Sequence, residues 1–154
     1  MRPLESTFFR LAPIAVAAVM AACGGSQPTD DTVNCQNDSR VMTYAPNLSV
    51  TAGSGLKYIL VQSTPAPPAK GTDTWNLKVT DAAGTPKPSL NLQIKTLMPD
   101  HGHGSSVTPT ITDGGGGNYT VNNLFLFMPG VWKITFAPAA APTDTADFLF
   151  CVPG

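Results

Sequence analysis

The chain has 154 residues, of which only 12% are charged, and its formal net charge at pH 7 is −1. This near-neutral balance and the lack of any basic run exclude binding to nucleic acid through a charged surface. Glycine and proline are abundant, with 14 and 15 residues. The length is enough for one domain with its own core, and the composition favours an exported β-protein with many turns.

The first segment of the chain has the pattern of an export signal. Arg2 and Arg10 precede an apolar run over residues 11–22, which is shorter than the roughly 20 residues that a membrane-spanning helix needs. The small residues before Cys23 resemble the lipobox of bacterial lipoproteins, whose cysteine is lipidated and becomes the first residue. We therefore expect a lipoprotein signal peptide over residues 1–22. An ordinary secretory peptide that is cleaved nearby is the alternative.

The residues after Cys23 are typical of a tether. The stretch Gly-Gly-Ser-Gln-Pro-Thr is flexible, so we expect a lipidated N-terminus and linker over residues 23–39, followed by one folded domain over residues 40–154. The domain would lie outside the cytoplasm, anchored to a bacterial membrane by the Cys23 lipid in the bilayer. Gly24 in place of an aspartate favours the outer membrane if the cell is Gram-negative.

Two further cysteines lie near the two ends of the folded part. If Cys23 carries lipid, Cys35 and Cys151 remain, and an oxidising compartment favours a disulfide between them. Such a disulfide would staple the two ends of the domain. The alternative is that one or both thiols bind a metal together with the histidines.

The body of the chain alternates short apolar segments with turn signals. Prolines 65, 67 and 68 end the first segment, and glycines 114–117 suit a hairpin turn with positive φ angles. Helical periodicity is lacking after residue 23. The predicted strands cover residues 56–62, 75–80, 90–95, 107–112, 119–127, 131–136 and 147–152. About seven strands at this spacing predict an all-β fold, an immunoglobulin-like antiparallel β-sandwich.

Both histidines of the chain lie in one short motif. Residues 98–104 read Met-Pro-Asp-His-Gly-His-Gly and follow a predicted strand, and residues 128–130 hold a second Met-Pro pair. A single glycine separates the two histidines, so their side chains point the same way in an extended segment. Imidazole and thioether are ligands that copper accepts. The sequence predicts a soft-metal site, copper above all, with the ligands His101, His103, Met98 and Met128.

A simpler interpretation of the same motif is structural. Methionine beside apolar strands often fills gaps in a core, and a His-Gly-His loop can be a tight turn whose imidazoles bond to Asp100, Asp113 or the backbone. In that case the protein is a metal-free domain that binds another envelope protein through its loops or a sheet edge.

The sequence does not favour an enzyme. The only glutamate is Glu5, in the predicted signal peptide, and the aspartates are scattered through turns, so no carboxylate pair suggests acid–base chemistry. Ser105 and Ser106 lie beside the histidines but no nucleophile elbow surrounds them. We expect a non-catalytic protein.

Four segments resemble one known family. Pro65-Ala66-Pro67-Pro68, the turn at 79–84, the motif at 98–104 and Phe-Met-Pro-Gly-Val-Trp at 127–132 are similar to the YtkA-like domain family, which is related to FixH-type accessory proteins. The resemblance covers roughly residues 55–152. It implies a small extracytoplasmic sandwich, often a lipoprotein, that takes part in copper handling or membrane protein assembly.

Overall fold

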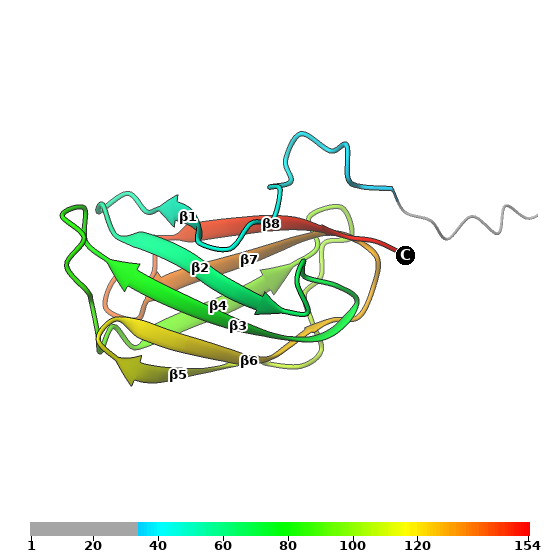
Figure 1. Cartoon of the computed structure of the whole chain (residues 1–154). Helices are drawn as coiled ribbons and strands as arrows, with labels where there is room; N and C mark the ends of the chain where they lie inside the picture. Colours follow the sequence, from blue (N-terminus) through cyan, green and yellow to red (C-terminus); the bar gives the residue numbers. More distant parts are fainter. Residues whose placement is uncertain (1–33) are drawn as a thin grey trace, which may run out of the picture.

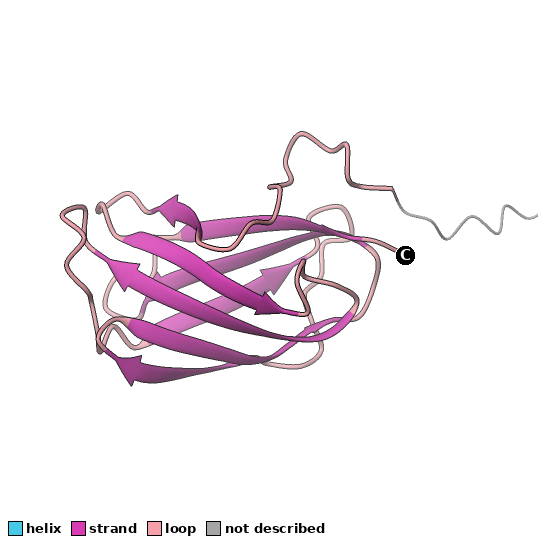
Figure 2. Cartoon of the chain, in the orientation of Figure 1, coloured by secondary structure: helices cyan, strands magenta, loops and turns pink. Residues whose placement is uncertain are grey.

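The computed structural model describes residues 34–154, which form a sandwich of β-strands (Figure 1). Strands and loops make up all of this part, and it contains no helix that could cross a membrane (Figure 2). The predicted signal peptide and Cys23 lie outside the described residues. The eight strands are β1 (Leu48–Thr51), β2 (Lys57–Thr64), β3 (Gly71–Thr80), β4 (Leu92–Leu97), β5 (Thr110–Gly115), β6 (Asn118–Leu126), β7 (Gly130–Pro138) and β8 (Ala146–Val152).

The strands form two antiparallel sheets. One sheet has five strands in the order β1-β2-β3-β6-β5, and the other has three in the order β4-β7-β8. Aromatic rings join the two layers, since Trp75 of β3 packs against Phe136 of β7 and against Phe148 and Phe150 of β8, with ring centres 5.5–6.3 Å apart. The predicted all-β sandwich is confirmed.

Period-two alternation places the core side chains. Trp75, Leu77 and Val79 are buried, whereas Asn76 between them is exposed. The same alternation along β7 buries Trp132, Ile134 and Phe136. All seven predicted strands are present. Alternating apolar residues mark the inner faces of strands such as β3, β6 and β7, whereas β5 has only Ile111 and is identified by the glycine turn that follows it.

β1 is an additional strand that the sequence pattern did not predict. It has only four residues, Leu48–Thr51, and pairs with β2 alone at the edge of the larger sheet. Two apolar residues in four are too few to establish a period.

The predicted glycine turn between β5 and β6 is confirmed, with positive φ angles at Gly115, Gly116 and Gly117.

A disulfide ties the N-terminal segment to the last strand. Cys35 is bonded to Cys151 of β8, with Cα atoms 5.3 Å apart and a sequence separation of 116. This is the pairing that the sequence analysis expected. In the chain-entropy model, closing so long a loop stabilises the fold by about 5 kcal/mol at most. Residues 34–39, the last part of the expected tether, are therefore held against the sandwich.

Candidate metal site

One end of the sandwich gathers the residues that the sequence singled out. Strand pairing shows this, because Leu126 at the end of β6 lies opposite Gly71 at the start of β3. Gly130 at the start of β7 lies opposite Val152 at the end of β8. β4 runs toward the same end, where it leads into Met98. The histidine motif, the second Met-Pro pair and the disulfide thus share one rim of the fold.

The histidine motif is a tight turn closed by its own backbone. Met98 and His103 form an isolated antiparallel bridge, in which the Met98 amide donates to the His103 carbonyl at 2.7 Å. The Met98 carbonyl accepts from the amides of His101 at 3.1 Å and Gly102 at 2.9 Å. Gly102 has φ +70°, the left-handed conformation that glycine adopts without strain. The turn therefore fixes the backbone on which both histidines stand.

The two imidazoles are exposed and close to each other. His101 and His103 are both solvent-accessible, and their ring centres are 5.6 Å apart with planes at 64°. A metal lies about 2 Å from an imidazole nitrogen, so two rings on one metal have centres roughly 5–6.5 Å apart. The observed separation is within this range.

The carboxylates near the histidines have other partners. Asp100 pairs with Arg40, and Asp113 accepts hydrogen bonds from the Ser89 and Gly115 amides. Among the described residues, the imidazole contact within hydrogen-bond distance is His103 Nδ1 to the Gly104 carbonyl at 3.2 Å. The imidazoles are thus not engaged by Asp100 or Asp113, but the backbone contact that the structural interpretation also named is present at His103.

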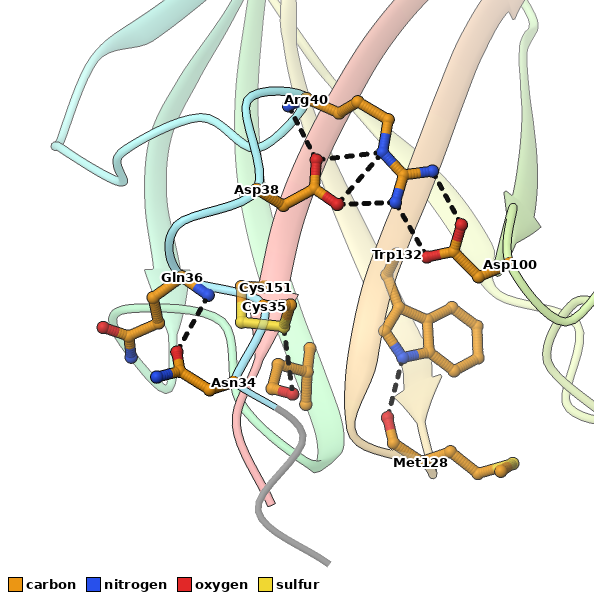
Figure 3. The surroundings of a disulfide bond; sticks show 10 residues. Asn34, Cys35, Gln36, Asp38, Arg40, Asp100, Met128, Trp132 and Cys151 are labelled. Atoms are coloured by element: carbon orange, nitrogen blue, oxygen red, sulfur yellow. Dashed lines mark hydrogen bonds and ion pairs between the residues drawn. A yellow bond between two sulfur atoms is a disulfide. The ribbon is translucent and has the colours of Figure 1, made fainter.

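The two methionines differ sharply in their surroundings. Met98 is 0% exposed and belongs to the core, with its methyl group against Gly130. Met128 is only partly buried, and its carbonyl accepts a hydrogen bond from the Trp132 indole at 2.8 Å (Figure 3). The Met128 thioether is therefore the more accessible of the two sulfurs.

Phe127 is a site residue that the sequence analysis did not predict. Its ring stacks on His103 with centres 5.8 Å apart and planes at 24°, and it packs edge-on against Trp132 at 5.7 Å. Phe127 follows the end of β6, so it reaches the histidine turn from the other sheet. Its place beside the Met-Pro pair was visible in the sequence, but the contact with a residue 24 positions away was not.

Arg40 is the second residue that sequence reasoning missed. Its guanidinium makes a bidentate contact with Asp100, at 2.7 and 2.8 Å, and also contacts Asp38 at 2.6 Å. Hydrogen bonds from Arg40 lower the pKa of Asp38 to about 2 and also lower the pKa of Asp100. Both carboxylates are therefore ionised at neutral pH, and Arg40 contacts Asp100 across 60 positions of sequence.

Asp73 is buried on the inner face of β3, at the same end of the sandwich. Its side chain is 0% exposed, and neither carboxyl oxygen has a hydrogen-bond partner of normal geometry. Burial raises the pKa of Asp73 to about 7, an effect that the nearby Ala69 amide and Trp75 indole only partly oppose. The alternation through Trp75 and Leu77 could have identified Asp73 as an inward-facing residue.

Few side chains at this rim could serve as metal ligands. Among residues 34–154, no group of three or more His, Cys, Asp or Glu side chains could hold a metal ion. The disulfide also removes Cys35 and Cys151 as thiolate ligands, which contradicts the alternative in which they bind metal with the histidines. The exposed donors of the predicted set are the two imidazoles, while Met128 is partly buried at the same rim and Met98 is in the core.

Comparison with known proteins gives one match. A sequence model described as YtkA-like matches residues 53–137, more than half of the chain. The matched segment runs from the end of β1 to β7 and includes the histidine motif and the second Met-Pro pair. No curated protein and no solved structure matches the chain.

Proposed function

The chain belongs to the YtkA-like family, and from this premise we propose that it is a lipid-anchored, extracytoplasmic module that binds copper through His101 and His103. It acts as a carrier or assembly accessory rather than as an enzyme. The observation that supports this best is the pair of exposed imidazoles, whose ring centres lie 5.6 Å apart on a fixed turn. Two imidazoles whose rings already lie this close together lose less freedom when one metal binds both than two distant rings would.

Copper is favoured over other metals by the kind of donors at the rim. Imidazole binds copper and zinc, but thioether sulfur selects Cu(I). We assign His101 and His103 as the primary ligands and the partly exposed Met128 as the third. Met98 completes the predicted set only if its side chain leaves the core, because it is fully buried against Gly130.

A site with few protein ligands suits transfer of the metal. Two or three ligands satisfy Cu(I), and the exposed rim leaves room for a donor or acceptor protein to approach. A structural zinc site would instead need about four protein ligands and would be closed. The proposed role is therefore exchange of copper with another envelope protein.

A second candidate is a metal-free interaction domain in the cell envelope. The backbone bonds that close the turn and the core position of Met98 favour it, because both features give the motif a structural role without metal. In this case the rim would contact a protein partner directly.

The test is a competition titration with Cu(I) against a chromogenic chelator. The soluble chain begins at Gly24, which retains all described residues, and the variant is His101→Ala with His103→Ala. Cu(II) and Zn(II) are titrated alongside. We expect one Cu(I) per chain and loss of this binding in the double variant.

The matched control is Lys87→Ala, a change at a partly exposed residue beyond the other end of β3. It should bind Cu(I) as the wild-type chain does. Equal affinities of wild type and the histidine double variant would contradict the copper function and leave the interaction domain.

A further inference from the structure

The residues before β1 form a strap that reaches the histidine turn. The strap, residues 34–41, is attached to β8 by the Cys35–Cys151 disulfide and carries Arg40 beyond it (Figure 3). Its own backbone contacts are two turn hydrogen bonds, from the Asp38 amide to Cys35 and from the Val41 amide to Asp38, both at 3.1 Å. It then joins the sheet, where the Met42 amide donates to Leu149 at 2.8 Å.

Arg40 makes the contact between the strap and the turn. Its two terminal nitrogens hold both oxygens of Asp100, the residue directly before His101. Asp38, on the strap itself, holds the guanidinium from the other side through its own carboxylate. A planar guanidinium that is fixed between two carboxylates has a defined orientation, which a single ammonium group would lack.

The disulfide anchors the strap before Arg40, as the hydrogen bond from Met42 to Leu149 anchors it after Arg40. Arg40 and Asp100 are both exposed, with 42% and 50% of their side-chain surface accessible, and exposed ion pairs alone contribute little. The disulfide lies five residues from Arg40 and keeps the guanidinium at a high effective concentration near Asp100. Without it, the strap would be held by surface contacts alone up to Met42.

We propose that the Cys35–Cys151 disulfide controls the histidine turn through Arg40, so that reduction frees the strap and loosens the turn. A dithiol reductant supplies the two electrons. One of its thiolates attacks a sulfur and breaks the S–S bond, and its second thiolate resolves the mixed disulfide. Cys35 and Cys151 take up the two protons and become thiols, while the reductant becomes a disulfide.

The effect of disulfide reduction on copper binding rests on the proposed function, whereas its effect on the turn does not. A looser turn holds His101 and His103 at a less defined separation, so more freedom is lost when a metal binds. The histidine turn of the oxidised protein should therefore bind Cu(I) more tightly than the same turn in the reduced protein. Freeing the strap would favour release of Cu(I) from His101 and His103.

Amide hydrogen exchange tests, without any metal, whether the disulfide controls the histidine turn. In the chain from Gly24, we follow the His101 and Gly102 amides, which bond to the Met98 carbonyl, and the Asp38 and Val41 amides of the strap. Dithiothreitol should speed exchange at His101 and Gly102 several-fold while the amides of β3 and β6 stay protected.

Variants separate the effect of the disulfide on the turn from the effect of the Arg40–Asp100 contact. Arg40→Ala should speed exchange at the turn with the disulfide intact, Arg40→Lys should have a smaller effect, and dithiothreitol should add nothing further to Arg40→Ala. The matched control is Lys87→Ala, which removes a partly exposed ion pair, Lys87 to Asp81 at 2.9 Å. It should leave the turn unchanged.

Two results would overturn the inference. In the first, reduction speeds exchange at Asp38 and Val41 but not at His101 and Gly102, which would show that the turn does not depend on the strap. In the second, reduction exposes the amides of β7 and β8 to the same extent, which would show that the disulfide only stabilises the whole fold.

The Cu(I) titration uses the double variant Cys35→Ser with Cys151→Ser in place of the reduced protein, because free thiolates would themselves bind Cu(I). This double variant and Arg40→Ala should both bind Cu(I) several-fold more weakly than wild type. If wild type binds no Cu(I), the proposed function fails, and the exchange data alone decide whether the strap controls the turn.

Discussion

The methyl group of Met98 fills the space above the backbone of Gly130. A Cβ built at position 130 would lie 2.8 Å from Met98 Cε, closer than side chains approach one another, and Gly130 has φ +134°. The glycine of the second Met-Pro motif thus accommodates the methionine of the first. This contact joins the histidine turn to the start of β7.

We expect Gly130→Ala to destabilise the fold by about 2 kcal/mol, mainly from strain at a positive φ and in smaller part from the buried Met98 methyl group, which must shift. Urea unfolding measures the change. Gly84→Ala is the matched control, because Gly84 also has a positive φ, +85°, but no atom near its missing Cβ. It should cost about 1 kcal/mol from strain alone. Equal losses in the two variants would contradict the role of Met98.

Stability should fall as pH rises through the range where Asp73 ionises. Burial raises the pKa of Asp73 from 3.8 to about 7, so between these values the folded state keeps a proton that the unfolded state has lost. In this pH range ionisation of Asp73 stabilises the unfolded state. The free energy of unfolding therefore decreases, by about 4 kcal/mol at most, and becomes constant above pH 7.

The variant Asp73→Asn should remove this decrease, which unfolding midpoints between pH 2 and 8 would show. Asp81→Asn is a control of opposite sign. The hydrogen bond from Lys87 lowers the pKa of Asp81, so its contribution is present above the unfolded pKa and is lost as pH falls. Parallel pH profiles for wild type and Asp73→Asn would contradict the buried, protonated carboxyl.

The fold could be predicted from the sequence because most of its strands carry local patterns. Alternation marked the inner faces of β3 and β7, and the glycines marked the turn into β6. β1 was missed since four residues show no period. Local pattern therefore sufficed wherever a strand was long enough to repeat.

The candidate site was only partly predictable, because its supports are far away in sequence. The motif identified His101 and His103, but Arg40 contacts Asp100 across 60 positions and has no local signal. The burial of Met98 depends on Gly130, which belongs to a different strand. The packing of β4 against β7 decides which methionine is in the core, and this cannot be predicted from a short motif.

Phe127 should support the orientation of His103. The variant Phe127→Leu keeps an apolar side chain but removes the stacked ring, so we expect Cu(I) affinity to fall by about two- to tenfold, the range that an aromatic pair of about 0.5–1.5 kcal/mol gives. Phe125→Leu is the control, because Phe125 stacks on Phe127 at 5.9 Å and has no ring contact with a histidine. A larger loss in the control would mean that general packing, not the stack on His103, sets the affinity.

The predicted lipid anchor depends on Cys23. Expressed with its signal segment in a bacterial host, the chain should incorporate radiolabelled fatty acid and fractionate with membranes. Cys23→Ser should abolish the label and release the protein from the membrane fraction, because a sulfur is needed to carry the lipid. Cys35→Ser is the matched cysteine control and should keep the label. Label that persists in Cys23→Ser would rule out the lipobox interpretation.

Met128 should matter for Cu(I) and not for metals that prefer harder ligands. Because thioether sulfur selects Cu(I), we expect Met128→Leu to lower Cu(I) affinity by about tenfold or more and to leave Zn(II) binding unchanged. Met42→Leu is the control, since Met42 is another partly buried methionine packed on the core, on the segment that pairs with Leu149. Met98→Leu should have little effect on Cu(I) if Met98 stays in the core and a large one if it turns out to bind. Unchanged Cu(I) affinity in Met128→Leu with a loss in Met98→Leu would reverse the assignment of the third ligand.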